Sequence, residues 1–204
     1  MVTILDYGAG NLTSVRHAFE RLGERPEVIA SAAEWRGGPL VFPGVGSAAS
    51  GMAAVRARGF DALLRAAAAS GTPVLGICLG MQLLLERSEE DGGTAGLGLI
   101  KGACVAFDPA KAPGAKVPHM GWNTVAPAAH PVLEGLGEEA FYFVHSYFAR
   151  PAEARDALGT TDYCGERFAS VVGRGSLVAT QFHPERSGAA GARLLANFLR
   201  WEGR

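Results

Sequence analysis

A cysteine between an apolar run and a helix-forming run is the residue best placed for nucleophilic chemistry. The run Pro73–Ile77 is typical of a buried strand, Cys78 stands between Gly76 and Gly80, and Leu79–Glu86 is typical of a helix. Such a corner exposes a nucleophile, and its glycines let backbone pass closely. The helix N-terminus favours thiolate over thiol. We therefore predict a nucleophile at Cys78; the alternative is the small buried hydrophobe that a free cysteine often is.

A nucleophilic cysteine needs a base, and His183 has the most suitable neighbours. In Phe182-His183-Pro184-Glu185, residues two apart on an extended chain point the same way, so Glu185 can lie beside the imidazole. Pro184 disfavours helix at His183 and keeps this stretch extended. One ring nitrogen would then face the carboxylate and the other the sulfur, which is triad chemistry. Taken alone, the motif could equally be a surface turn.

Acyl chemistry also requires donors for the oxyanion. The backbone N–H of Leu79 follows the nucleophile directly, and a second donor could come from Gly44-Val45-Gly46, after the predicted strand Leu40–Phe42. The alternative for Pro43–Gly46 is an ordinary strand-to-helix loop. A phosphate-binding loop is not indicated, because the lysine and hydroxyl residues of that motif are missing.

The remaining histidines and cysteines are weaker candidates. His17, inside a predicted helix, and His130, before Pro131, are expected to be solvated, while His119 and His145 near strand ends could line a site. Neither of the latter two has a carboxylate spaced to orient it. Cys104 and Cys164 lack the neighbours of a zinc site and are expected to be inert thiols. We expect no metal and no cofactor.

The elements that must position these residues change character along the chain. The first half alternates short apolar strands, at Val2–Leu5, Pro26–Ile29, Leu40–Phe42 and Pro73–Ile77, with helices at about 11–22, from Ser47, and at Phe60–Ala69. This predicts a parallel sheet covered on both faces. The second half indicates strands at Gly98–Phe107, Gly121–Val125, Phe141–Phe148, Phe168–Val172 and Ser176–Phe182, then a helix at Ala189–Trp201. Gly173–Gly175 is predicted to join the last two strands as a hairpin.

Composition narrows the class of protein. The chain has 204 residues, so one domain, 1–204, is favoured over two very small ones. A formal charge of −1 argues against nucleic-acid binding. No apolar run approaches membrane-spanning length, and the first residues lack the basic start of a signal peptide. The three cysteines do not suggest a disulfide framework, so a cytoplasmic location is expected.

The motif pair around Cys78 and His183 resembles that of class I, triad-type, glutamine amidotransferases. The resemblance narrows through Asp6–Leu12, Phe42–Gly46, His119–Asn123 and Tyr142–Tyr147 to the glutaminase subunits of imidazole glycerol phosphate synthases, in histidine biosynthesis. It covers nearly the whole chain. It implies an α/β, flavodoxin-like fold of three layers, whose mostly parallel central sheet has helices on both faces and added antiparallel strands in the second half.

The resemblance also implies roles for individual residues. Cys78, His183 and Glu185 would convert glutamine to glutamate and ammonia through a cysteinyl thioester, with Gln82, Ser146 and Tyr147 holding the substrate. The ammonia would pass to a cyclase subunit, a (β/α)8 barrel, in a heterodimer. The residues implied at that interface are Asn11, Met120, Trp122, Tyr142 and Arg186.

Two departures and three alternatives qualify this resemblance. Arg186 stands where the family usually has lysine, which keeps the charge but changes hydrogen-bond geometry. Cys164 occupies a turn where glycine is common, and Trp122 could be a core residue, since buried aromatics are common. The chain could instead be an amidotransferase subunit of another pathway, a free-standing γ-glutamyl hydrolase, or a binding module without catalysis, although an intact triad argues against the last.

Overall fold

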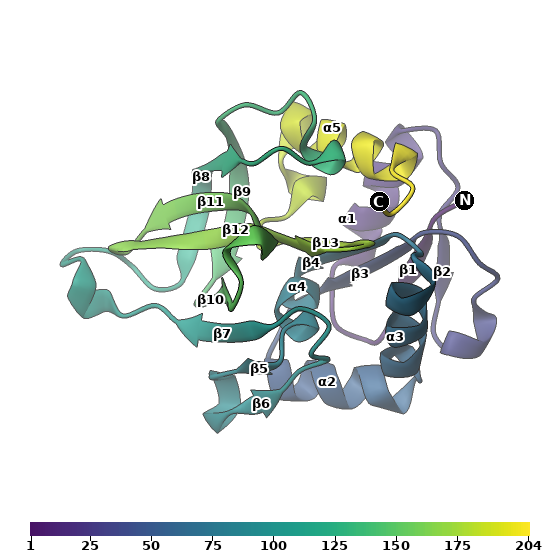
Figure 1. Ribbon diagram of the computed structural model, residues 1–204, viewed down its shortest axis with the longest axis horizontal. Helices are drawn as coiled ribbons and strands as arrows, with labels where there is room; N and C mark the ends of the chain where they lie inside the picture. Colours follow the sequence, from purple (N-terminus) through teal and green to yellow (C-terminus); the bar gives the residue numbers. More distant parts are fainter.

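The computed structural model describes residues 1–204 as helices packed on both faces of one 13-stranded sheet (Figure 1). The helices are α1 (Leu12–Arg21), α2 (Ala48–Ala57), α3 (Phe60–Ser70), α4 (Leu79–Leu84) and α5 (Gly188–Arg200). The strands of the first half are β1 (Thr3–Leu5), β2 (Glu27–Ile29), β3 (Leu40–Gly44), β4 (Val74–Cys78), β5 (Arg87–Ser88) and β6 (Thr94–Ala95). Those of the second half are β7 (Gly102–Ala106), β8 (His119–Pro127), β9 (Glu139–His145), β10 (Tyr147–Pro151), β11 (Ala157–Tyr163), β12 (Glu166–Arg174) and β13 (Leu177–Thr180).

The sheet has a parallel part and an antiparallel part. Its order is β2-β1-β3-β4-β13-β12-β10-β7-β5-β6, and every pair from β2 to β13 is parallel. From β13 to β7 each pair is antiparallel, and β11, β8 and β9 extend the sheet away from β12. The predicted α/β class and the added antiparallel strands are therefore confirmed.

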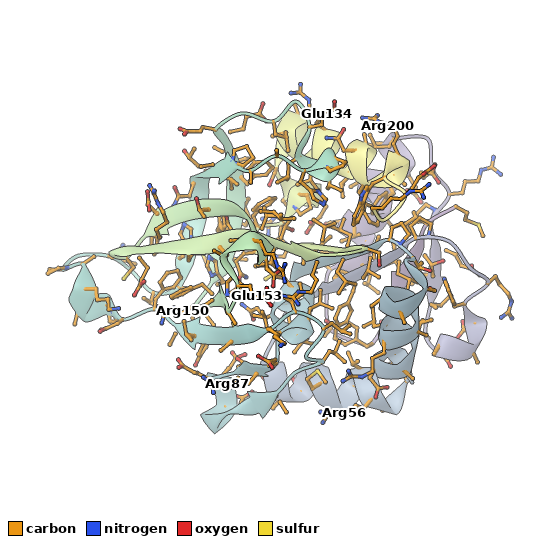
Figure 2. The ribbon with its side chains drawn as sticks, in the orientation of Figure 1. Arg56, Arg87, Glu134, Arg150, Glu153 and Arg200 are labelled. Atoms are coloured by element: carbon orange, nitrogen blue, oxygen red, sulfur yellow. The ribbon has the colours of Figure 1, made fainter.

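Alternate residues of the parallel strands face two separate cores, as the period of a strand requires. Ile4, Val41 and Leu75 belong to one buried cluster, together with side chains of α1 and α5. Leu5, Leu40 and Val74 belong to the other, with side chains of α2, α3 and α4. The side chains fill the space between the helices and the sheet, whereas charged groups such as Arg56 and Arg200 lie at the periphery (Figure 2). No helix is both long and apolar enough to cross a membrane.

Several predicted boundaries are corrected by the structure. Phe141–Phe148 is not one strand: β9 pairs with β8, β10 pairs with β7 and β12, and the chain changes partners at Ser146. The strand predicted from Gly98 begins only at Gly102, and β11 was not predicted, because its polar alternation is weak. Helix α4 ends at Leu84 rather than Glu86, since Leu85 has extended backbone. The β12–β13 hairpin is confirmed.

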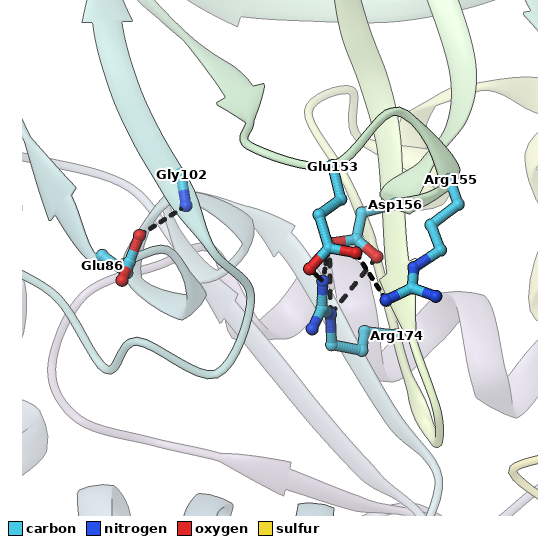
Figure 3. A network of polar contacts seen from close by, with 6 residues as sticks. All are labelled: Glu86, Gly102, Glu153, Arg155, Asp156 and Arg174. Atoms are coloured by element: carbon cyan, nitrogen blue, oxygen red, sulfur yellow. Dashed lines mark hydrogen bonds and ion pairs between the residues drawn. The ribbon is translucent and has the colours of Figure 1, made fainter.

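An ionic cluster holds the turn end of that hairpin, where Arg174 pairs with Leu177. The guanidinium of Arg174, on β12, donates to Asp156 at 2.6 Å and to Glu153 at 2.7 Å, and Arg155 pairs with Glu153 on its other side (Figure 3). Asp156 is only 3% exposed, so this pair has few competing waters. The cluster fixes the hairpin that brings β13 alongside β4, and β13 leads to His183.

Candidate active site

Cys78 lies at the predicted corner between a strand and a helix. Strand β4 ends at Cys78 and α4 begins at Leu79. Its backbone has φ +54° and ψ −109°, a positive-φ conformation that is strained for any residue with a Cβ. A Cβ on Gly80 would overlap the carbonyl of Phe42, and one on Gly76 would come within 2.8 Å of the Ala179 Cβ. Both glycines are therefore needed for the corner to pack against β3 and β13.

His183 and Glu185 form the predicted pair. The imidazole Nδ1 lies 2.8 Å from the Glu185 carboxylate, and the two side chains are 7% and 3% exposed. The extended conformation predicted for this stretch holds for His183 but is wrong beyond it. Pro184–Arg186 form one turn of 3₁₀ helix, η6, because the fixed φ of Pro184 suits the first position of such a turn. The turn still brings the carboxylate to the ring.

The electrostatics of His183 favour its protonated form. Burial alone lowers its pKa, but the Cys78 sulfur and the Glu185 carboxylate outweigh burial and raise the pKa well above 6.5. The other ring nitrogen of His183, Nε2, has no hydrogen-bond partner within the protein. Its neighbour is the Cys78 sulfur. A protonated imidazole beside the sulfur stabilises thiolate, the reactive form of cysteine. The structure places the Cys78 sulfur and the Glu185 carboxylate on either side of the His183 ring, which is the arrangement that a triad would need.

A cavity of about 370 Å³ opens in front of Cys78. It is lined by several residues that the sequence singled out, namely Val45, Gly46, Leu79, Gln82, Ser146 and Tyr147. Gly44 pairs with Cys78 in the β3–β4 register, directly beneath the 45–46 turn. The Gln82 amide donates to the Tyr147 carbonyl at 3.0 Å, which connects α4 to the start of β10. We refer to this hollow as the Cys78 cavity.

Sequence reasoning missed two polar residues near Cys78, one that lines the cavity and one that is buried beside the sulfur. Glu90, in a 3₁₀ turn (Glu90–Gly92), lines it and accepts the Ala48 N–H at 2.8 Å; burial raises the pKa of its carboxyl. Gln181 is fully buried and its amide nitrogen lies 3.8 Å from the Cys78 sulfur. Gln181 directly precedes the Phe182–Glu185 motif, and its position beside that motif was the available signal. Nothing in the Glu-rich run around Glu90 distinguished that residue.

An exposed aromatic face lies on the outer side of β8 and β9. Met120 and Trp122 are 63% and 60% exposed, so the alternative that Trp122 is a core residue is wrong. Its ring meets Tyr142 nearly edge-on at 6.2 Å, and the Arg186 guanidinium lies 4.2 Å from the centre of the Tyr142 ring. Asn11 caps α1, next to Gly10, which lies against Gly44. We call Met120, Trp122, Tyr142 and Arg186 the aromatic face.

The rival candidates have other surroundings. Cys104 is buried, and burial raises the pKa of its thiol, as an inert cysteine requires. Cys164 adopts φ +53°, which explains why glycine suits its turn. His17 is exposed, whereas His130 is half-buried and accepts the Val132 N–H, so the expectation of a solvated His130 is corrected. His119 and His145 are buried against one another. Of the two, His145 also lines the Cys78 cavity, as expected of a residue near a strand end, and His119 does not.

Comparison with known proteins points to one family. The family model described as glutamine amidotransferase class-I matches residues 3–201. Proteins named imidazole glycerol phosphate synthase subunit HisH are similar over nearly their full length. The Methylococcus capsulatus protein is 48% identical over 98% of this chain and 96% of its own, and the Geobacillus kaustophilus protein is 46% identical over the same shares.

Solved structures share the fold at lower sequence identity. A crystal structure of a glutamine amidotransferase superimposes with a TM-score of 0.76 at 21% identity, covering 100% of this chain and 99% of that one. The structure of PurLQS from Thermotoga maritima gives a TM-score of 0.76 at 18% identity, covering 98% and 97%. These identities support the fold alone.

Proposed function

The chain belongs to the class-I glutamine amidotransferases, and we propose that Cys78, His183 and Glu185 are the triad with which it hydrolyses glutamine. It is the glutaminase subunit of an imidazole glycerol phosphate synthase, in histidine biosynthesis. The single observation that supports the triad best is the strained corner of Cys78, set beside an imidazole that a buried carboxylate holds.

The catalytic cycle follows from the positions of these side chains. The Cys78 thiolate attacks the side-chain amide carbon of glutamine, and the resulting oxyanion accepts hydrogen bonds from the Leu79 N–H and from the 44–46 turn. Protonated His183 gives its proton to the leaving nitrogen, which releases ammonia and leaves a γ-glutamyl thioester. His183 then takes a proton from water as the water attacks, and glutamate departs. Glu185 keeps the imidazole oriented throughout.

The cavity offers groups that match glutamine. The α-ammonium group of glutamine requires a carboxylate, which Glu90 provides. Gln82 and the backbone of Ser146 and Tyr147 would hold the remaining parts of the substrate. Burial and the fixed Ala48 contact keep Glu90 in place. The 370 Å³ volume suits a single small amino acid.

The partner is a cyclase subunit, which is implied by the subunit names of the relatives. We propose that it is a (β/α)8 barrel, that it docks on the aromatic face and Asn11, and that ammonia passes to it in a cytoplasmic heterodimer to give imidazole glycerol phosphate and aminoimidazole carboxamide ribotide. Exposed Trp122 and Met120 support docking, because a free-standing hydrolase needs no such surface.

The test is the glutaminase rate of the chain alone, with the cyclase, and with the cyclase and its nucleotide substrate. We expect little hydrolysis by the free chain and a large increase in the full complex. Equal rates in the three mixtures would contradict partner-dependent catalysis. Co-purification of the cyclase from the source cell is the accompanying check.

A further inference from the structure

Two buried histidines form a hydrogen-bonded chain between β8 and the Cys78 cavity. The Asn123 amide nitrogen lies 3.2 Å from His119 Nε2, and His119 Nδ1 lies 2.9 Å from His145 Nε2. His145 Nδ1 lies 2.8 Å from the carbonyl oxygen of Tyr147. His119 opens β8 and His145 closes β9, directly opposite it in the register. Catalysis as proposed above makes no use of either ring.

The protons of this chain can be placed only one way. A carbonyl oxygen only accepts, so His145 Nδ1 carries a hydrogen and its Nε2 accepts from His119 Nδ1. His119 Nε2 must then accept from Asn123, whose other amide hydrogen goes to the Asp162 carbonyl at 3.1 Å. Burial lowers the pKa of His119 to about 4 and that of His145 to about 3, so each ring carries one proton at neutral pH.

Aromatic rings enclose the chain. Tyr163 and Phe143 stack on His119 with centroids 3.8 and 4.7 Å away, and Phe107 contacts both histidines. His119 and His145 are only 3% and 5% exposed. Hydrogen bonds are stronger in such surroundings, and a polar group left unpaired there is costly.

The end of the chain is a carbonyl at the wall of the cavity. The Tyr147 oxygen accepts from His145 and also from the Gln82 amide, so two donors fix it. We propose that His119 and His145 are positioning residues: they hold the Ser146–Tyr147 wall and Gln82 in the geometry that binds glutamine. They also connect that wall to β8, which carries Met120 and Trp122. The inference rests on the proposed function and adds residues to its substrate site.

The experiment uses the complex with the cyclase and compares leucine and asparagine at both positions. In His145→Leu and His119→Leu the chain is broken, and we expect KM for glutamine to rise about tenfold with a smaller change in kcat. The amide nitrogen of asparagine takes the place of Nδ1, so His145→Asn and His119→Asn should recover most of the affinity. Packing alone predicts the reverse order, because leucine suits an aromatic shell better than asparagine.

Further variants keep the outcome decisive. His130→Leu, at a half-buried histidine elsewhere, should leave KM unchanged, and ammonia-driven synthesis should be unchanged in every variant. If a leucine variant fails to fold, His145→Gln replaces it in the test. The glutamine amide takes the place of Nε2 but does not reach the Tyr147 carbonyl. We therefore expect a raised KM for glutamine in this variant. A normal KM in folded leucine or glutamine variants, or asparagine no better than leucine, overturns the inference. A wild-type complex without glutamine-driven synthesis would instead overturn the proposed function.

Discussion

At the scale of residues, the reactivity that we propose for Cys78 comes from its neighbours rather than from cysteine itself. The backbone conformation at Cys78 directs the sulfur into the cavity, and His183 places a positive charge beside it. Glu185 is almost fully buried and bonded to the ring, so its charge is felt with little screening. The positive charge of the imidazole beside the Cys78 sulfur therefore depends on one carboxylate.

Glu185→Gln tests this dependence. The amide keeps the shape but removes the charge, so the pKa of His183 should fall and the protonated ring should persist over a narrower pH range. We expect kcat to fall by about 10²–10⁴-fold. The rate of Cys78 alkylation by iodoacetamide, followed against pH, should be lower at pH 7 in the variant. An unchanged alkylation profile would show that the carboxylate does not tune the pair.

Site residues whose partners lie within a few positions in the sequence were predictable at this scale. Site residues whose partners are distant in the sequence were not. Cys78 is flanked by its own glycines, and His183 lies two residues from its carboxylate, so spacing alone indicated both. Glu90 reaches the cavity from a short 3₁₀ turn that no local pattern marks. Gln181 follows β13 and lies against the Cys78 sulfur, a contact that the sequence does not show. The His119–His145 contact joins opposite ends of two strands and becomes visible only with their register.

At the scale of elements, the strand–corner–helix unit requires close approach between β3 and α4. We expect Gly80→Ala to lower the free energy of unfolding by at least about 1–3 kcal/mol, because the alanine Cβ would overlap the Phe42 carbonyl. Gly137→Ala is the matched control: no atom lies within 4 Å of the place its Cβ would take, and it should change stability by less than about 0.5 kcal/mol. Chemical denaturation measures both. Equal effects would disprove the packing explanation.

The β8–β9 ribbon contributes a pH dependence of stability. His119 and His145 have pKa values lowered by burial to about 4 and about 3, so the unfolded chain binds more protons than the folded one below pH 6.5. Their stabilising contribution is complete above pH 6.5 and is lost as the pH falls toward 4 and 3, at about 1.4 kcal/mol per pKa unit. The His119→Asn/His145→Asn double variant should lose less stability than wild type between pH 7 and 4. Parallel losses would contradict this assignment.

Strands with strong apolar patterns were predicted well, and those defined by their partners were not. The predicted strands Leu40–Phe42 and Pro73–Ile77 were recognised from their apolar runs, and their residues 40–42 and 74–77 are buried on both faces. The division of Phe141–Phe148 at Ser146 follows from a change of strand partner, which composition does not encode.

At the scale of the whole molecule, the aromatic face lies near His183 on the side where η6 meets β9. The His183 N–H donates to the Tyr142 carbonyl at 2.9 Å, so one backbone hydrogen bond joins the proposed docking surface to the proposed triad. Trp122→Ala should weaken cyclase binding by about 2 kcal/mol, about thirtyfold in Kd, as a central aromatic does. Val28→Ala, on β2 at the far edge of the sheet, should leave Kd unchanged. Calorimetric titration with the cyclase measures both, and a normal Kd for Trp122→Ala would exclude that residue from the interface.

The most direct measurement compares two nitrogen sources in the assembled synthase carrying Cys78→Ala. With glutamine we predict that synthesis of imidazole glycerol phosphate falls to background, because no other thiol or hydroxyl replaces the sulfur at the corner. With ammonium salts we predict the wild-type rate, since the cyclase then needs nothing from the triad. Glutamine-driven synthesis that survives the substitution would contradict the assignment of Cys78 as the nucleophile.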